Sequence, residues 1–113
     1  LEGVFYHVGE NDMSFGPFRR GAAQRIGQLV EASRKDLKEK NLRWFISQQP
    51  PTDHEDVNGI DVMSEVAALA AADKNTFHIA VDDLPPQAKQ LVISTEGIVA
   101  LGARLAEEFL ASR

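Results

Sequence analysis

The sequence predicts a single α/β domain built on parallel strands. Its 113 residues suit one domain with one hydrophobic core. Three short stretches rich in β-branched and aromatic residues alternate with three longer stretches in which apolar residues recur every three or four positions. Strands separated by helices of this length pair in parallel through right-handed crossovers. The predicted order is therefore βαβαβα, with three strands and three helices.

The first strand and the first helix are predicted in the N-terminal third of the chain. Residues 3–8 (Gly-Val-Phe-Tyr-His-Val) form an apolar run bounded by Gly9-Glu10-Asn11-Asp12, which is typical of a buried strand followed by a loop. A helix is expected from Pro17 to about Lys40, because apolar or small residues then follow a helical spacing and Asn41 marks the end. These positions are Ala22, Ile26, Leu29, Val30, Ser33 and Leu37.

The second strand and the second helix follow in the middle of the chain. Residues 42–47 (Leu-Arg-Trp-Phe-Ile-Ser) repeat the strand pattern, and the prolines of Gln48-Gln49-Pro50-Pro51 end it. A helical pattern then runs to about Asp73, and we expect Asp53 or Asp56 to cap its first turn.

The third strand and the last helix complete the predicted domain. Residues 76–81 (Thr-Phe-His-Ile-Ala-Val) form the strand, which ends at Asp82-Asp83-Leu84-Pro85-Pro86. Ser94 is placed to cap the last helix. The predicted apolar stripe of that helix consists of Ile98, Leu101, Gly102, Leu105, Ala106 and Phe109.

Alternation along the strands predicts one apolar face and one mixed face. The apolar face would carry Val4, Tyr6, Val8, Leu42, Trp44, Ile46, Phe77, Ile79 and Val81. The mixed face would carry Phe5, His7, Arg43, Phe45, Ser47, Thr76, His78 and Ala80. A sheet of three strands has two open edges, so we expect it to be completed by missing strands or by self-association.

Composition excludes several classes of partner and chemistry. The net charge of −5 repels phosphate backbones, so no nucleic-acid partner is expected. No apolar run approaches the roughly 20 residues that cross a bilayer, so no membrane partner is expected. The absence of cysteine removes disulfides, thiolate metal ligands and cysteine nucleophiles, and leaves the compartment open. The chain begins with Leu1 rather than Met, which suggests a fragment or a processed product.

Chemistry in an open parallel sheet is expected beyond the carboxyl ends of its strands. Three loops meet this condition: residues 9–16, 48–56 and 82–93. In the first loop Gly9 permits a sharp turn, and Asn11 directly after the strand is a candidate donor to an oxyanion. The alternative is that Gly-Glu-Asn-Asp is an ordinary turn or a helix cap.

The stretch from Gly3 to Asp12 resembles a known block. It is similar to the G-(apolar)-(apolar)-W-(H/Y)-Q-G-E-S-D block of sialate O-acetylesterase-like carbohydrate acetylesterases, a group of the SGNH hydrolase superfamily. Later features resemble the C-terminal half of that group in the same order: Arg34, Gln48-Gln49, Asp83-Leu84, Thr95-x-Gly97 and Leu101-Gly102-x-Arg104-Leu105-Ala106. The resemblance implies a three-layer, flavodoxin-like parallel sheet of five strands, of which this chain would be the last three. It also implies hydrolysis of acetyl esters on sugars through a serine ester, without a cofactor.

The resemblance also suggests site residues. Glu10, Asn11 and Asp12 are the catalytic candidates, and Asn11 is the candidate oxyanion donor by its resemblance to the Gly-x-Asn-Asp block of the superfamily. The candidate substrate-binding residues, for an acetylated carbohydrate, are Gly9, Phe15, Gln48 and Asp83. An aromatic ring such as Phe15 beside this loop would stack on a sugar, or else act as a hydrophobic staple.

The sequence departs from the family's pattern at the catalytic positions. It has no Gly-Asp-Ser block for the nucleophile, and the two positions of the Asp-x-x-His block fall on Lys89 and Val92. The Trp and Gln of the first block fall on Tyr6 and Val8. A serine nucleophile needs a base within hydrogen-bond reach. We therefore expect the isolated chain to be inactive.

Other polar residues allow alternative interpretations. His54, which lies among Asp53, Glu55 and Asp56, is a weak candidate for a base; the alternative is a solvated loop, and no calcium-loop spacing predicts a metal there. His7 and His78 are expected to be packed or interface histidines on the mixed face. The second function that fits the sequence is a non-catalytic α/β interaction module, which self-associates or binds a partner through an open sheet edge.

Overall fold

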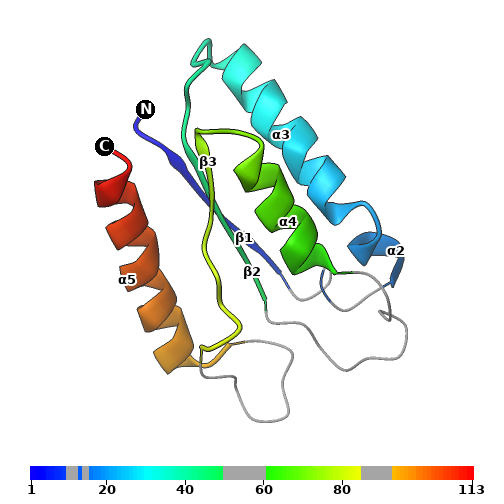
Figure 1. Ribbon diagram of the computed structural model, residues 1–113, viewed down its shortest axis with the longest axis vertical. Coiled ribbons are helices and arrows are strands. Elements are labelled where there is room, and N and C mark those ends of the chain that lie inside the picture. Colours follow the sequence, from blue (N-terminus) through cyan, green and yellow to red (C-terminus); the bar gives the residue numbers. More distant parts are fainter. Residues whose placement is uncertain (10–12, 14–15, 50–60, 85–92) are drawn as a thin grey trace.

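The computed structural model describes residues 1–9, 13, 16–49, 61–84 and 93–113, and it confirms the α/β class (Figure 1). Strands and helices alternate along the chain, with one additional short helix before the first long one. The elements are β1 (Val4–Val8), α2 (Gly16–Arg19), α3 (Ala22–Asp36), β2 (Trp44–Gln48), α4 (Val62–Ala71), β3 (Thr76–His78) and α5 (Thr95–Ala111).

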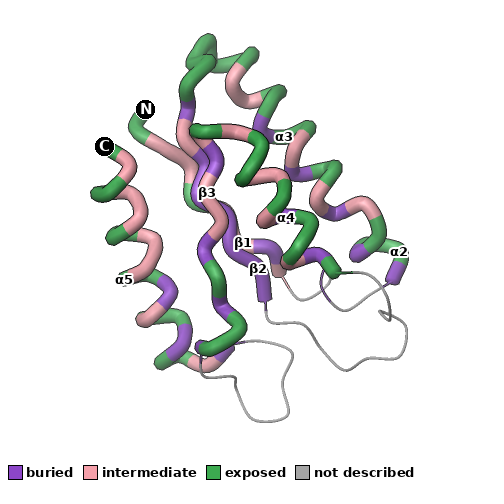
Figure 2. The backbone as a smooth tube through the Cα atoms, in the orientation of Figure 1, coloured by how far each residue is buried: buried purple, intermediate pink, exposed green. Residues whose placement is uncertain are grey.

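The three strands form a parallel sheet in the order β1-β2-β3, as the alternation of strands and helices predicts. Val4 is in register with Trp44, which in turn is in register with Thr76. The central strand β2 is buried along its whole length, as expected for a parallel sheet covered on both faces (Figure 2).

Helices cover the two faces of the sheet unequally. The helices α3 and α4 pack on one face, where Ile26 and Val66 meet Trp44 and Ile46 in the larger core cluster. The helix α5 packs on the other face, and its Leu101 joins Phe45 in a second cluster. The result is a three-layer arrangement, with α5 on the opposite side of the strands from α3 and α4 (Figure 1).

The predicted face of the third strand is wrong by one residue. Phe77 lies in register with Phe45, and their rings stack with centroids 5.0 Å apart, so Phe77 faces α5 rather than α4. Thr76 and His78 therefore face the α3/α4 side. The cause is local: the Thr76 hydroxyl donates to Asp73 Oδ2 at 2.6 Å, which turns residue 76 toward α4. It follows that His7 and His78 lie on opposite faces of the sheet, not on one.

The boundaries of the helices also differ from the predicted ones. Instead of one helix from residue 17 to residue 40 there are two, and Gly21 between them adopts a left-handed φ of 76° that glycine accepts without strain. Asp61 caps α4 in place of the predicted Asp53 or Asp56, because its Oδ1 accepts from the Ser64 N–H at 3.0 Å. Ser94 caps α5 as predicted and accepts from the Gly97 N–H at 3.1 Å.

The predicted apolar stripe of α5 is only partly buried. Leu101 is buried with Gly97, and Leu105 and Phe109 pack against the same cluster. In contrast, Gly102 and Ala106 are exposed, and Ile98 exposes half of its surface. The helix is rotated so that the Phe109 ring meets Phe45 at a centroid distance of 5.8 Å. None of the described helices is long and apolar enough to cross a membrane.

Candidate functional site

The candidate site lies at the carboxyl ends of the strands, where each strand delivers a polar side chain. His7 comes from β1, Ser47 and Gln48 come from β2, and His78 comes from β3. We refer to these four residues as the strand-end cluster. Register explains the grouping, because parallel pairing sets His7 beside Ser47 although 40 positions separate them in the sequence.

His7 and Ser47 form one half of the strand-end cluster, on the α5 side of the sheet. The distance between His7 Nδ1 and Ser47 Oγ is 2.7 Å. Burial lowers the pKa of His7 below its ordinary value, so the imidazole is neutral at pH 7. The other ring nitrogen of His7, Nε2, is buried and has no hydrogen-bond partner in the described part of the chain.

Gln48 and His78 form the other half of the cluster. His78 Nε2 donates to Gln48 Oε1 at 2.7 Å, so the neutral ring carries its proton on Nε2. Burial lowers the pKa of His78, and the nearby Asp82 carboxylate opposes this effect. Gln48 is fully buried, and its Nε2 has no partner among the described residues. An amide group in that situation costs about 1–3 kcal/mol unless a ligand or a water satisfies it.

A buried arginine is hydrogen-bonded to Met13, a described residue between β1 and α2. Arg19, the last residue of α2, exposes only 5% of its surface, and its guanidinium donates to the Met13 carbonyl oxygen. Burial lowers the pKa of Arg19, and the carboxylates of Asp61 and Glu65 oppose this shift. The arginine therefore connects α2 to Met13, and the carboxylates of Asp61 and Glu65 near the start of α4 act on its charge.

Hydrogen bonds also fix the chain segments that enter and leave β3 and α5. Gln49 Oε1 accepts from the Ile93 N–H at 2.9 Å, which connects the end of β2 to the segment before α5. The carboxylate of Asp83 accepts one hydrogen bond from each terminal nitrogen of Arg104, both at 2.7 Å. The hydrogen bonds from Arg104 lower the pKa of Asp83, so this exposed carboxylate remains ionised near neutral pH.

The structure describes three of the residues that the sequence suggests for the site. Gly9 follows β1 directly, and its neighbour Val8 accepts from the Gln49 N–H at 2.9 Å, so Gly9 lies beside the end of β2. Gln48 belongs to the strand-end cluster. Asp83 instead pairs with Arg104 of α5, a stabilising contact that explains it without a ligand. Five candidates lie outside the described residues: Glu10, Asn11, Asp12, Phe15 and His54.

Sequence reasoning missed the hydrogen bond between His7 and Ser47 and the role of Arg19. A signal for the first was present, because both residues occupy the next-to-last positions of adjacent strands. Arg19 gave no signal, since an arginine at the end of a short helix is normally solvated. His7 and His78 each have one hydrogen-bond partner within the chain, while Nε2 of His7 has none among the described residues.

The pair of His7 and Ser47 has the composition of a nucleophile and its base, but its surroundings do not suit that chemistry. Ser47 exposes none of its surface, so a substrate carbonyl cannot approach its oxygen. No described residue accepts a hydrogen bond from His7 Nε2, whereas a catalytic imidazole is oriented by a third group. The pair therefore joins β1 to β2. No group of three or more described His, Asp or Glu side chains is arranged to hold a metal ion.

A parallel sheet with helices on both faces and polar side chains at the strand ends defines an open α/β protein, whose site lies beyond the carboxyl ends of the strands. Within that class, a family model described as carbohydrate esterase, sialic acid-specific acetylesterase, matches residues 1–111. The chain belongs to this family. The comparisons with curated proteins and with solved structures found no match.

The family match confirms the resemblance that residues 3–12 and the later features suggest. It covers the whole described sheet and all four described helices. The loop after β1 and the strand-end cluster therefore lie within the part of the chain that the carbohydrate esterase family shares.

Proposed function

We propose that this chain is the C-terminal part of a carbohydrate O-acetylesterase, that it contributes the oxyanion loop to the site, and that by itself it does not hydrolyse esters. The observation that carries the proposal is the family match over residues 1–111. In this proposal the substrate is an acetylated carbohydrate, and Asn11 donates a hydrogen bond to the oxyanion that forms when the acetyl carbonyl is attacked.

The contacts around the loop after β1 support this role. An oxyanion donor is effective only when it is held in place before the reaction, so the segments beside it must be rigid. On one side, Val8 is bonded to Gln49 of the buried end of β2. On the other side, Met13 is fully buried and its carbonyl oxygen accepts a hydrogen bond from the Arg19 guanidinium. Both described flanks of residues 10–12 are thus fixed to the sheet or to α2.

The absence of a nucleophile motif supports the second part of the proposal. The sequence contains no Gly-Asp-Ser block, and Lys89 and Val92 stand at the two positions of the family's Asp-x-x-His block. Among the described residues, the serine nearest to a histidine is Ser47, which is buried. A serine and a histidine from outside this chain would have to complete the reaction.

The test is labelling with a serine-reactive fluorophosphonate, read by intact mass, together with hydrolysis of 4-nitrophenyl acetate and of an O-acetylated sialic acid. We expect no adduct and no hydrolysis above the rate in buffer. A stoichiometric adduct with turnover that is lost on Asn11→Ala would contradict the proposed inactivity. Ser47→Ala is the matched variant, because loss of the adduct there would assign the nucleophile to the strand-end cluster.

Ligand binding tests the esterase assignment independently of turnover. In a titration followed by amide NMR, an O-acetylated sialic acid should shift the resonances of Gly9 and its neighbours, and Asn11→Ala should weaken binding at least threefold. The unacetylated sugar is the control, and equal shifts with both sugars would argue against acetyl recognition.

The second candidate function is a non-catalytic interaction module. It is favoured by the outer edge of β1, with which no strand of the described residues pairs and beside which Phe5 exposes 53% of its surface. Such a module would bind its partner equally well in the Asn11→Ala variant, whereas acetyl recognition would not survive that change.

A further inference from the structure

Two arginines hold the short helix α2 between α3 and Met13. Arg19, the last residue of α2, exposes 5% of its surface and donates to the Met13 carbonyl oxygen. Arg25 of α3 donates to the carbonyl oxygens of Phe18 and Arg20, the second of these at 3.1 Å. Hydrogen bonds from arginine side chains thus run from α3 to α2 and from α2 to Met13.

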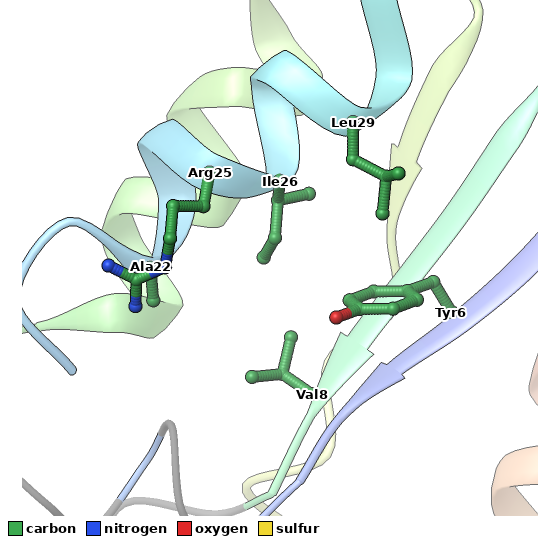
Figure 3. Close-up of a pocket in the computed structure, with 6 residues that line it drawn as sticks. All are labelled: Tyr6, Val8, Ala22, Arg25, Ile26 and Leu29. Carbon is green, nitrogen blue, oxygen red and sulfur yellow. The ribbon is translucent and has the colours of Figure 1, made fainter. Parts of the chain in front are cut away.

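The Arg25 side chain is directed toward the junction of the two helices. In Figure 3 its guanidinium lies near Ala22, at the start of α3, while Tyr6 and Val8 of β1 line the opposite side of the hollow that it borders. Gly21, which joins α2 to α3 with a φ of 76°, has no side chain to restrict the backbone there. The hydrogen bonds of Arg25 therefore fix the orientation of α2 on α3.

The burial of Arg19 calls for an explanation beyond stability. An arginine is almost never fully buried unless it is paired, because its charge must leave water. Apolar residues that replace a buried ion pair often leave stability unchanged or raise it. An apolar side chain at position 19 could fill the same space, but it could not donate a hydrogen bond to the Met13 carbonyl oxygen. That directed bond is what the arginine adds.

The start of α4 favours the charged form of this arginine. Asp61 caps α4, where its two carboxylate oxygens accept from the Ser64 N–H at 3.0 Å and from the Ser64 hydroxyl at 2.6 Å. Glu65 follows in the first turn. Burial lowers the pKa of Arg19, and the carboxylates of Asp61 and Glu65 oppose that effect. The acidic start of α4 therefore compensates part of the cost of burying the guanidinium.

We propose that Arg19 is a positioning residue for the segment from Gly9 to Met13, so that it holds Asn11 where an acetyl group binds without touching the ligand itself. This inference rests on the proposed function, in which Asn11 is the oxyanion donor. Asn11 lies two positions before Met13, which Arg19 fixes. A donor that is held in place before the ligand arrives loses less conformational freedom on binding and needs no reorganisation during the reaction.

Ligand binding by two matched variants tests the proposal. Arg19→Met removes the guanidinium and keeps a side chain that fills space, and Arg20→Met changes an exposed neighbour in the same way. In an amide NMR titration, Arg19→Met should weaken binding of an O-acetylated sialic acid about threefold or more, whereas Arg20→Met should not. Arg19→Lys should recover part of the affinity, because an ammonium can still donate to the Met13 carbonyl oxygen. Unchanged affinity in Arg19→Met would overturn the proposal.

A double variant distinguishes positioning from a general structural role. If Arg19 acts through Asn11, the variant with both Arg19→Met and Asn11→Ala should bind the acetylated sugar no more weakly than Asn11→Ala alone. If the two residues act independently, the fold-changes of the single variants should multiply. Multiplying effects would contradict the positioning role, even if Arg19→Met alone weakens binding.

Backbone dynamics test the same role without a ligand. The order parameter of the Met13 amide should be about 0.85 in the unmodified chain and in Arg20→Met, and it should fall below about 0.6 in Arg19→Met. Circular dichroism must show that Arg19→Met is folded. If it is not, Arg25→Met at an exposed position takes its place, with a smaller decrease expected because it loosens α2 and leaves the bond to Met13 intact.

The two kinds of measurement separate the positioning role from the proposed function. A Met13 amide that stays rigid in the folded variant would overturn the positioning role of Arg19, whatever the sugar titrations show. Equal binding of acetylated and unacetylated sugar by the unmodified chain would instead count against the proposed function. In that case a decrease of the Met13 order parameter in Arg19→Met would still support Arg19 as the residue that fixes this segment.

Discussion

Replacing Arg34 with alanine should destabilise the domain more than any other single change of an arginine in the described helices, because this side chain joins three elements. Arg34 lies near the end of α3. Its Nε donates to the Leu42 carbonyl at 3.0 Å, and its terminal nitrogens donate to Asp73 Oδ2 at 2.5 Å and to the Asn75 carbonyl at 3.2 Å. These contacts hold the start of β2 and the start of β3 against the helix.

The magnitude follows from the number and type of the lost bonds. A net hydrogen bond is worth about 1 kcal/mol and one to a charged group about 1.5–3 kcal/mol. The side chains of Arg34 and Asp73 are only 16% and 29% exposed, so water replaces the lost donors incompletely. Arg34→Ala should therefore cost about 3 kcal/mol of the 5–15 kcal/mol expected for a domain of this size.

The pH dependence of stability gives a second measure of the same contact. Burial raises the pKa of Asp73, but hydrogen bonds from Thr76, Asn75 and Arg34 outweigh it and lower the pKa below the ordinary value. The resulting stabilisation is present above the unfolded pKa of about 3.9 and is lost as the pH falls through the lower folded value. In Arg34→Ala this acid-dependent loss should become smaller.

Urea denaturation at pH 7 and pH 3.5 measures both quantities. Lys35→Ala is the matched control, because the neighbouring lysine is exposed and should change stability by less than about 0.5 kcal/mol. Arg34→Lys should recover only part of the loss, since one ammonium cannot reach all three acceptors. A cost below about 1 kcal/mol for Arg34→Ala would refute the reasoning that these bonds are shielded from water.

Three further predictions concern the core, the helix caps and the histidines. Phe45→Ala should cost about 3–5 kcal/mol in urea denaturation, because the buried Phe45 contacts aromatic rings from β1, β3 and α5; a loss under about 2 kcal/mol would mean that the cavity collapses. Asp61→Ala and Ser94→Ala should each lower stability by about 1 kcal/mol in thermal unfolding, and the more conservative Asp61→Asn and Ser94→Thr should restore most of it. The free energy of unfolding should fall as the pH drops below about 6.5, the unfolded pKa of histidine. The reason is that burial lowers the pKa of both His7 and His78, so the unfolded chain binds more protons than the folded one in this range. His7→Asn should make the free energy of unfolding depend less steeply on pH, and an unchanged dependence would contradict a neutral His7.

The existence and order of the strands could be predicted because their apolar runs are short, aromatic and bounded by turn residues. The face of β3 could not, because its orientation depends on one hydrogen bond between Thr76 and Asp73 rather than on hydrophobic alternation. The break at Gly21 was missed for a related reason. A glycine within a periodic helical pattern is tolerated in many helices, and only its positive φ shows that two helices meet there.

For the candidate site, too, the sequence predicts some features and not others. The carboxyl ends of the strands could be predicted as its location from topology alone, and Gln48 indeed lies there. The partners within the strand-end cluster could not be predicted, because they depend on the parallel register that sets His7 beside Ser47. The assignment of Asp83 was ambiguous in sequence, since a carboxylate after a strand is equally suited to a ligand or to an ion pair such as the one with Arg104.

The strand register shows where the two residues of β1 that differ from the family block lie in the core. Tyr6 and Val8 stand where the resemblance has Trp and Gln, and both face the α3 side. Tyr6 keeps an aromatic ring against Trp44, with centroids 6.1 Å apart, so that change preserves the packing. Val8 is different, because it is almost fully buried in the core beside Met13 and Ala22. A glutamine there would bring a polar amide to the carboxyl end of β1, whereas valine extends the apolar core to that point. Valine at this position therefore keeps the apolar packing of the sheet and leaves no polar side chain of β1 next to Gly9.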